Sequence, residues 1–252
     1  MKLYIEETKE ALGAAAAALI AERLNQAIAE RGSARVVLST GRSQFETLEA
    51  LVRCSVPWEK VTMFHLDEYI GIPDTHPASF RKYLRERFIS KVSLKEAVLV
   101  NVEGDVDAQI ALVAERLREE PVDVGVIGIG ENAHIAFNDP PADFEGREAY
   151  WRVKLNDTCR KQQVGEGWFT TVDEVPAEAV SMTPYQIMCC RCIVSPVPLS
   201  VKASAIFKVL SARETDPMVP ATLLKTHGDF HLFVDADSAS ACSQELLAQY
   251  TA

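Results

Sequence analysis

The chain has 252 residues, 48% of them hydrophobic, and a formal net charge of −10. An acidic balance of this size argues against non-specific binding to nucleic acid or to acidic membranes as its main task. It does not exclude an anionic substrate, because a few local cations and backbone amides can hold a phosphate inside an acidic protein.

Strand-like and helix-like segments alternate along the chain. The first helix is expected over residues 7–31, where an alanine-rich periodic run ends at Gly32. Short apolar strands are expected near residues 35–39, 61–66, 98–101, 122–127, 191–195 and 229–234. A second helix is expected to end near residue 53. Further helices are expected over residues 78–89, 108–119, 200–212 and 219–224. This alternation predicts one α/β domain over residues 1–252, with a mainly parallel sheet covered by helices on both faces.

Residues 142–179 are too long and polar for an ordinary connection. Loops of this length are usually lids, binding elements or disordered segments, and the aromatic residues Trp151, Trp168 and Phe169 disfavour plain disorder. We expect a mobile lid that closes over substrate, with glycines near residues 165–167 as hinges. A structured surface excursion is the alternative.

The six cysteines include the cluster Cys189-Cys190-x-Cys192, which suggests metal binding at first sight. No second Cys or His pair stands at zinc-finger spacing, so we expect reduced, mostly buried thiols in a cytoplasmic protein and no metal. We expect no signal peptide, because acids precede the alanine-rich run. Apolar runs fall far short of the roughly 20 residues of a membrane helix.

The segment Ser39-Thr40-Gly41-Arg42-Ser43 stands where a strand turns into a helix. Such a turn gathers backbone N–H groups, hydroxyls and the positive end of a helix, which suit a phosphate, and Arg42 adds a fork of donors. Helix capping by Ser43 explains the segment equally well. The spacing and lysine of a Walker loop are lacking, so ATP is not expected.

Two consecutive acids, Asp67 and Glu68, end another expected strand. Adjacent side chains on a strand point to opposite faces, so we expect one acid to enter the cleft and the other to meet a salt bridge or solvent. A carboxylate in the cleft is a suitable base for removing a proton next to a carbonyl or imine. A solvated acidic turn is the alternative.

A third strand ends in residues 128–140, Gly-Ile-Gly-Glu-Asn-Ala-His-Ile-Ala-Phe-Asn-Asp-Pro. This segment places His134 between Asn132 and Asp139. An imidazole titrates near neutral pH, and such neighbours can fix its tautomer for proton transfer. A turn with a capping Asn and a core His is the alternative. Because the ends of parallel strands share one edge of a sheet, we expect the three segments to converge.

These segments closely resemble the glucosamine-6-phosphate deaminase (isomerase) family. The resemblance is carried by residues 64–73, by His-Pro-x-Ser-Phe at 76–80 and by residues 128–140, with residues 39–43 before them and Lys202 after them. The order of the motifs matches over nearly the whole chain. Related 6-phosphogluconolactonases share the fold and the Gly-x-Gly-x-x-x-His core but usually lack the Asp-Glu-Tyr and Ile-Ala-Phe-Asn pieces.

The resemblance implies a Rossmann-like α/β fold and conversion of glucosamine 6-phosphate to fructose 6-phosphate and ammonia. It implies that His134 helps to open the sugar ring, that Asp67 carries a proton between C2 and C1, and that Asp139 supports the histidine. The phosphate would lie on residues 40–43 and Lys202. No metal or organic cofactor is implied, because the carbonyl and amine of the substrate supply the reactivity.

Three positions depart from the family pattern. The family's usual Asp two residues before His134 is Asn132, and an amide cannot stabilise an imidazolium as a carboxylate does. The second acid, usually Glu, is the shorter Asp139. The phosphate-binding Arg of the lid has no unambiguous match, and Arg160 or Lys161 would substitute. We therefore expect a divergent member with slower ring opening or a different amino sugar phosphate.

Two other functions stay open from the sequence. One is hydrolysis of a sugar-phosphate lactone, with His134 activating water and Asp67 largely dispensable. The other is a catalytically weak sensor that binds a sugar phosphate, which Asn132 favours. The expected partner is a phosphorylated amino sugar, not nucleic acid or membrane. The sequence does not choose between a monomer and a homo-oligomer.

Overall fold

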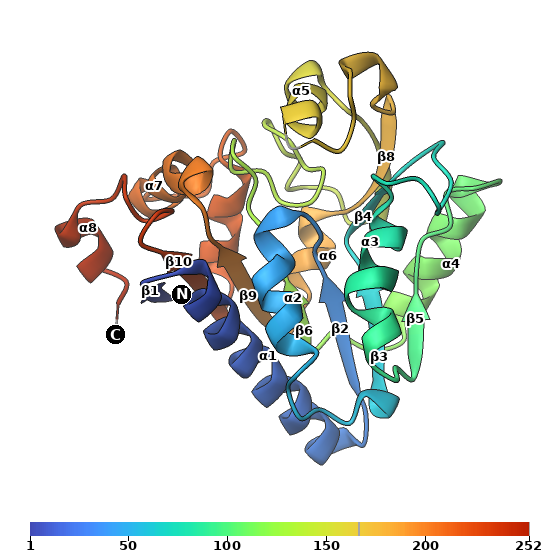
Figure 1. The fold of residues 1–252 in the computed structure, drawn as a ribbon, viewed down its shortest axis with the longest axis horizontal. Coiled ribbons are helices and arrows are strands. Elements are labelled where there is room, and N and C mark those ends of the chain that lie inside the picture. Colours follow the sequence, from blue (N-terminus) through green and yellow to red (C-terminus); the bar gives the residue numbers. More distant parts are fainter. Residues whose placement is uncertain (166, 252) are drawn as a thin grey trace.

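The computed structural model describes residues 1–165 and 167–251, and a parallel sheet lies at its centre (Figure 1). In this part of the chain the sheet has seven strands in the order β1-β10-β9-β6-β2-β3-β5, and every neighbouring pair is parallel. The strands are β1 (Lys2–Glu6), β2 (Ala34–Leu38), β3 (Val61–His65), β5 (Glu96–Val98), β6 (Val124–Val126), β9 (Cys192–Val197) and β10 (Phe230–Asp235). The expectation of a mainly parallel sheet is confirmed.

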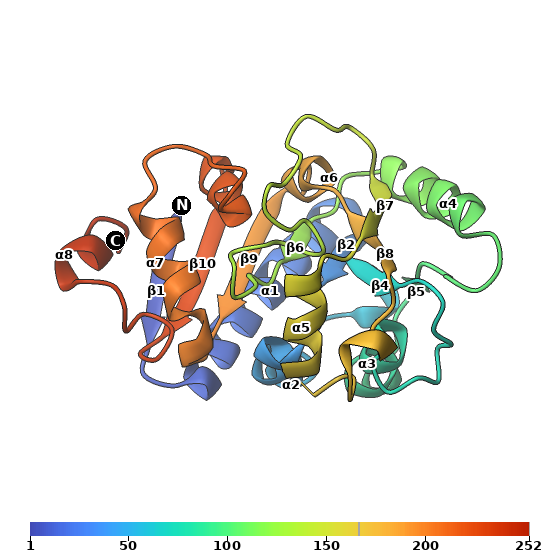
Figure 2. The same ribbon diagram turned by 90° about the horizontal axis from the view of Figure 1, so that it is seen from above.

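Helices cover both faces of this sheet, as expected. The α-helices are α1 (Lys9–Arg31), α2 (Phe45–Leu51), α3 (Phe80–Arg87), α4 (Val106–Arg118), α5 (Asp157–Gly165), α6 (Pro184–Met188), α7 (Ala203–Ser211) and α8 (Gln244–Ala248). The 3₁₀ helices are η1 (Arg42–Gln44), η2 (Trp58–Lys60), η3 (Ile89–Lys91), η4 (Val172–Glu174), η5 (Ser200–Lys202) and η6 (Pro220–Thr226). Seen from above, α2 and α3 lie on one side of the sheet and α4 and α6 on the other (Figure 2).

The two faces of the sheet build two separate apolar cores, because successive side chains of a strand point to opposite sides. In β2, Val36 and Leu38 belong to the core that contains residues of α1, α2 and α3, whereas Val37 belongs to the core that contains residues of α4, α6, α7 and α8. All three side chains are fully buried. Strands that are buried on both faces have continuous apolar sequences, and for this reason the central strands can be predicted from the sequence.

Helix α1 begins and ends at clear local signals. The Thr8 hydroxyl accepts a hydrogen bond from the backbone N–H of Ala11, and the helix stops at Gly32, whose φ of 81° is left-handed. The expected helix end is therefore confirmed. In the described residues no helix combines the length and the apolar character that crossing a bilayer requires.

A second, smaller sheet was not anticipated. Strand β4 (Asp67–Tyr69) follows β3 after one residue but pairs antiparallel with β8 (Glu178–Met182), which pairs in turn with β7 (Tyr150–Lys154). Residues 142–179, expected to form a lid, thus contain β7, α5 and the start of β8. Figure 2 shows α5 lying over the ends of the central strands. The segment is folded, and its closing motion stays a prediction.

Candidate active site

A cavity of about 940 Å³ lies where the carboxyl ends of the central strands meet α5. Segments that follow β2, β3, β6 and β9 line it, together with residues of α5 and α7. The predicted convergence of three segments is therefore present. The predicted residues that line the cavity are Ser39, Thr40, Gly41, Arg42, Ser43, Asp67, Asn132, His134 and Lys202. Asp139 lies directly behind His134, and Arg160 is not among the lining residues.

The imidazole of His134 is held through its Nδ1 atom. Nδ1 lies 2.6 Å from Oδ1 of Asn132 and 3.2 Å from Oδ1 of Asp139. The Asn132 amide nitrogen donates to the same Asp139 oxygen over 2.9 Å, so its carbonyl oxygen must face the ring. Because both neighbours of Nδ1 are acceptors, this nitrogen carries the proton of the neutral ring. Nε2 is then left with a lone pair for proton transfer.

The backbone around His134 is shaped for this placement. A Cβ atom on Gly130 would lie 2.2 Å from Cε1 and 2.3 Å from Nε2 of the imidazole, so the ring lies directly on the glycine. Ala133 and Ala136 have φ values of 67° and 50°, in the left-handed region that residues other than glycine rarely adopt. Such backbone strain persists where the surrounding structure determines it, and it is typical of functional sites.

Asp139 supplies a fixed negative charge behind the ring. Burial by itself would raise the pKa of this carboxyl, but hydrogen bonds from His134, Asn132 and Cys159 together outweigh it, and the pKa lies below its ordinary value. An ionised Asp139 stabilises the imidazolium that forms when Nε2 accepts a proton. Cys159 contacts Asp139 from α5, and no local sequence pattern predicts this contact.

Asp67 and Glu68 point to opposite sides of β4, as predicted. Asp67 faces the cavity with an exposure of only 7%, and burial together with the charge of Glu68 raises its pKa to about 8. Glu68 is fully buried and accepts hydrogen bonds from Ser79 Oγ at 2.8 Å and from Arg81 Nε at 3.1 Å. The alternative of a solvated acidic turn is therefore wrong.

The turn after β2 presents donors to the cavity. Gly41 has a φ of 104°, and its carbonyl accepts a hydrogen bond from the Tyr83 hydroxyl at 2.8 Å. The hydroxyl oxygen of Ser39 is buried without a hydrogen-bond partner among the described residues. Ser43 caps neither η1 nor α2: the residues at those cap positions are Gly41 and Gln44, and neither end has a side-chain cap. The capping alternative is therefore wrong. The Ser43 oxygen accepts a hydrogen bond from Gln44 Nε2 at 3.1 Å, which leaves the hydroxyl proton for a ligand.

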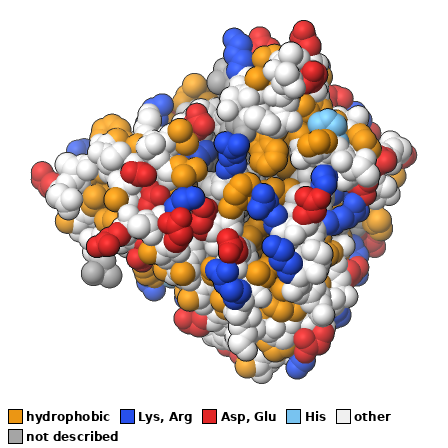
Figure 3. Space-filling model, viewed as in Figure 1, with side chains coloured by type: hydrophobic (Ala, Val, Ile, Leu, Met, Phe, Trp, Pro, Cys, Tyr) orange, Lys and Arg blue, Asp and Glu red, His pale blue; other side chains and the backbone are white. Residues whose placement is uncertain are grey.

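The cavity is locally cationic although the chain is acidic. In the described part of the chain, Arg42, Lys161, Lys202 and Lys208 line it, and the acids that line it are Asp67 and Glu131. Lys202 has an exposure of only 6%, at the end of η5. Lysine and arginine side chains also gather over α3 on the face shown in Figure 3. The excess of cationic over acidic side chains lining the cavity favours an anionic ligand.

Of the two lid cations considered for phosphate binding, only Lys161 lies at the cavity. The Arg160 guanidinium instead donates to the backbone carbonyls of Val172 at 2.6 Å and Val175 at 3.3 Å. The expectation for Arg160 thus needs correction: its contacts make it an anchor between α5 and η4. Neighbours on a helix point about 100° apart, so the two residues were indistinguishable until α5 was placed.

Sequence reasoning missed several lining residues from the lid, from η5 and from α7, namely Gln162, Gln163, Trp168, Ser200, Val201 and Lys208. The described residues also contain one group of three metal-ligating side chains, Cys192, Asp229 and His231. None of the three lines the cavity.

Comparison with known proteins assigns the chain to a family. The family described as glucosamine-6-phosphate isomerases/6-phosphogluconolactonase matches residues 7–232. A glucosamine-6-phosphate deaminase from Listeria monocytogenes serotype 4a (strain HCC23) is 36% identical over 205 residues, covering 81% of this chain and 85% of the relative. One from Streptococcus pneumoniae (strain 70585) is 28% identical over 241 residues, covering 95% and 98%.

Solved structures agree with this assignment. A monomeric glucosamine-6-phosphate deaminase superposes with a TM-score of 0.86 at 27% identity, covering 96% of this chain and all of that one. A putative 6-phosphogluconolactonase from Neisseria gonorrhoeae FA 1090 shares the fold, with a TM-score of 0.73 at 20% identity and coverage of 93% and 99%. The chain belongs to the glucosamine-6-phosphate isomerase/6-phosphogluconolactonase family.

Proposed function

We propose that the protein is a glucosamine-6-phosphate deaminase, which converts D-glucosamine 6-phosphate and water to D-fructose 6-phosphate and ammonia. The observation that carries the proposal is the meeting of three groups in one cavity: His134 with a free Nε2, the buried carboxyl of Asp67, and a cationic turn. The relative that is 36% identical over 81% of the chain bears this name. The net reaction is hydrolysis of a C–N bond.

The first step is opening of the sugar ring. Backbone and hydroxyl groups of residues 40–43, with Lys202 and Lys161, hold the phosphate at one end of the cavity. His134 Nε2 then removes the proton from the anomeric hydroxyl and delivers it to the ring oxygen as the bond between C1 and that oxygen breaks. Asn132 and Asp139 keep Nδ1 protonated and the ring oriented throughout.

The second step moves a proton from C2 to C1. Asp67 removes the C2 proton of the open-chain aldehyde while a proton passes from the substrate ammonium to O1, which gives an enolamine. Asp67 then returns its proton to C1, which leaves a protonated imine at C2. Water adds to this imine and ammonia departs, so that a ketone remains. A carboxyl group with a pKa of about 8 suits this task, because it both accepts and returns a proton near neutral pH. The substrate ammonium next to it favours the ionised form.

The position of Asp67 favours this reaction over lactone hydrolysis. Burying a carboxyl group without a compensating hydrogen bond is costly, and a lactonase that needs only His134 and water would have no use for it. The deciding experiment is to incubate the protein with glucosamine 6-phosphate and to measure ammonia and fructose 6-phosphate. A parallel assay with 6-phosphogluconolactone tests the hydrolase, and a ligand-induced rise in Tm without turnover would identify a sensor.

We also propose a cytoplasmic location. All six cysteines are free thiols, and three of them, Cys159, Cys190 and Cys192, are buried. Free thiols persist in reducing compartments, whereas secreted proteins usually pair them. Thiol titration of protein from a gently lysed native source would test this, because disulfide-linked material would contradict the proposal.

A further inference from the structure

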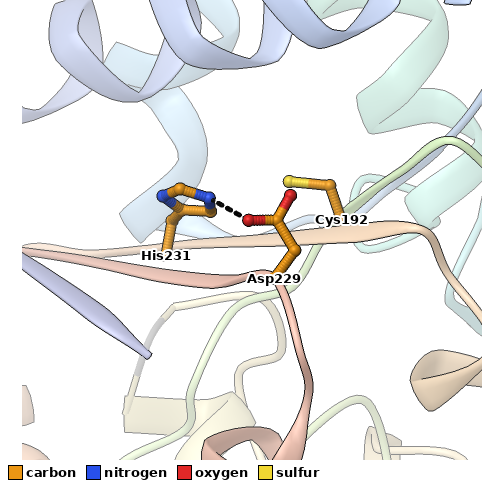
Figure 4. A group of neighbouring side chains, drawn as sticks. All are labelled: Cys192, Asp229 and His231. Carbon is orange, nitrogen blue, oxygen red and sulfur yellow. Dashed lines mark hydrogen bonds and ion pairs between the residues drawn. The ribbon is translucent and has the colours of Figure 1, made fainter.

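Three side chains that commonly bind metals meet at the amino ends of β9 and β10 (Figure 4). Cys192 is the first residue of β9, and Asp229 directly precedes β10, in which His231 is the second residue. The cysteine sulfur, a carboxylate oxygen and an imidazole nitrogen all lie within 4.8 Å of one another. The cavity lies at the opposite, carboxyl end of the strands.

The sheet itself brings these side chains together. Asp229 and His231 are two residues apart, so both side chains point to the same face of the sheet. The backbone N–H of Ile193 donates to the carbonyl of Asp229 at 2.9 Å, which sets Cys192 beside Asp229 on the neighbouring strand. Both strands are hydrogen-bonded on each side, β9 to β6 and β10, and β10 to β1 and β9. The backbone that carries Cys192, Asp229 and His231 is therefore held in place by the sheet.

Burial and outer contacts resemble those of a built metal site. Cys192 and His231 have exposures of 3% and 1%, while the Asp229 side chain is 36% exposed and leaves a path from solvent. His231 Nε2 lies 2.8 Å from Asp229 Oδ1, and its Nδ1 lies 3.0 Å from the Tyr4 hydroxyl. Histidines that bind metals are usually oriented by such a contact on the other ring nitrogen.

We propose that Cys192, Asp229 and His231 form a binding site for a divalent transition metal of the Zn²⁺ class. A thiolate sulfur, an imidazole nitrogen and a carboxylate oxygen are the ligands that Zn²⁺ takes, and water would complete a tetrahedron. Mg²⁺ and Ca²⁺ prefer oxygen ligands and do not suit this set. On binding, the Cys192 thiol loses its proton to solvent and a sulfur–metal bond forms. The carboxylate exchanges the imidazole for the metal, and His231 changes tautomer: Nε2 releases its proton and binds the metal, while Nδ1 gains a proton and donates it to the Tyr4 hydroxyl oxygen.

A competing cation stands beside the site. The guanidinium of Arg23, from α1, lies 3.4 Å from Oδ2 of Asp229 and offsets the charge of that carboxylate. A metal ion would bring a second positive charge to the same group, so Arg23 opposes binding. Replacing Arg23 by Gln should therefore tighten metal binding, whereas replacing an arginine away from the site, Arg53, should leave it unchanged.

The test is a titration of chelator-treated, reduced protein with Co²⁺, because Zn²⁺ itself gives no visible absorption. We expect one Co²⁺ per chain, a thiolate-to-cobalt charge-transfer band, the strong visible bands of four-coordinate Co²⁺, and loss of both signals when Zn²⁺ is added. Cys192→Ser should abolish the charge-transfer band. Cys189→Ser, at an exposed cysteine, and Cys159→Ser, in the lid, should retain it.

A variant that does not depend on a buried position protects the test against misfolding. Asp229→Asn should weaken Zn²⁺ binding, measured by competition with a chromophoric chelator, by roughly tenfold or more. Arg23→Gln should strengthen it in the same assay. The proposal is overturned if the unmodified protein gives no thiolate band, if the band survives in Cys192→Ser, or if Asp229→Asn and Arg23→Gln bind Zn²⁺ with unaltered affinity.

Discussion

The amide of Asn132 is oriented by a neighbour on each side. Its nitrogen donates to Asp139 and its oxygen faces the protonated Nδ1 of His134, so one side chain fixes both the carboxylate and the tautomer of the ring. What an amide does not provide is charge. During ring opening the imidazole becomes positive. Among the described residues, Asp139 is the acid that lies next to the ring and stabilises this charge.

This reasoning predicts that Asn132→Asp increases turnover. A second carboxylate at Nδ1 stabilises the imidazolium, so we expect kcat to rise by up to about tenfold. The measurement is a pH series of ammonia release. Asn132→Ala is the matched control, because it removes the acceptor without adding charge and should lower kcat. An unaltered kcat for Asn132→Asp would show that the charge does not reach the ring.

Asp67→Asn should abolish deamination and leave binding intact. The amide keeps the shape of the side chain but accepts no proton from C2, whereas the phosphate contacts lie elsewhere in the cavity. In the unmodified protein Asp67 must be ionised to act, so kcat/KM should rise with pH and level off above about 8. Ammonia release tests the first point, and a substrate-induced rise in Tm of the variant tests the second. Normal turnover by Asp67→Asn would remove it from the mechanism.

At the scale of elements, the lid contains two adjacent cations with separate tasks. Lys161→Met should raise KM for glucosamine 6-phosphate roughly tenfold with little effect on kcat, because it removes one charge from the ligand cavity. It should also weaken competitive inhibition by inorganic phosphate. Arg160→Met should instead increase the protease sensitivity of residues 157–175, because α5 loses its anchor on η4. If Lys161→Met and Arg160→Met gave the same pattern, the division of tasks would be wrong.

The elements that could be predicted from the sequence are those with strong local signals. Apolar, β-branched runs marked β2, β3 and β6, and their ends carried the residues of the cavity. Strand β4 has three residues and is defined by its distant partner β8, which no local pattern reports. Helix α5 is rich in polar residues and lacks a clear apolar period, so it was indistinguishable from a loop.

The same limit applies to the candidate site. Asp67 and His134 stand directly after strands, where chemistry is expected, and sequence reasoning found them. Lys208 and Cys159 lie on helices, and whether they face the cavity or its acids depends on how those helices pack. Tertiary packing of this kind is not encoded in any short segment.

At the scale of the whole molecule, Asp67 links the site to stability. Its pKa is about 8 in the fold and near its ordinary value when unfolded, so between these values the folded state binds more protons. The free energy of unfolding contributed by this group should therefore fall as pH rises from about 4 to 8. Asp67→Asn should raise Tm by several degrees at pH 8 and much less at pH 4. Thermal melts at both pH values check this, and an equal shift at the two would contradict it.

The two groups that carry out the proposed reaction belong to different sheets. His134 follows a strand of the large sheet, whereas Asp67 belongs to β4, which is hydrogen-bonded to β8 and through it to the lid strands. A displacement of the lid strands would therefore reach Asp67 through the backbone of β4. It would reach His134 only through side-chain contacts, such as the hydrogen bond from the Phe137 N–H to Ser181 Oγ at 3.1 Å and the contact of Cys159 with Asp139. A sugar that contacts both Asp67 and His134 therefore spans the two sheets. How well a substrate fits depends on the distance between these sheets and not on either sheet alone.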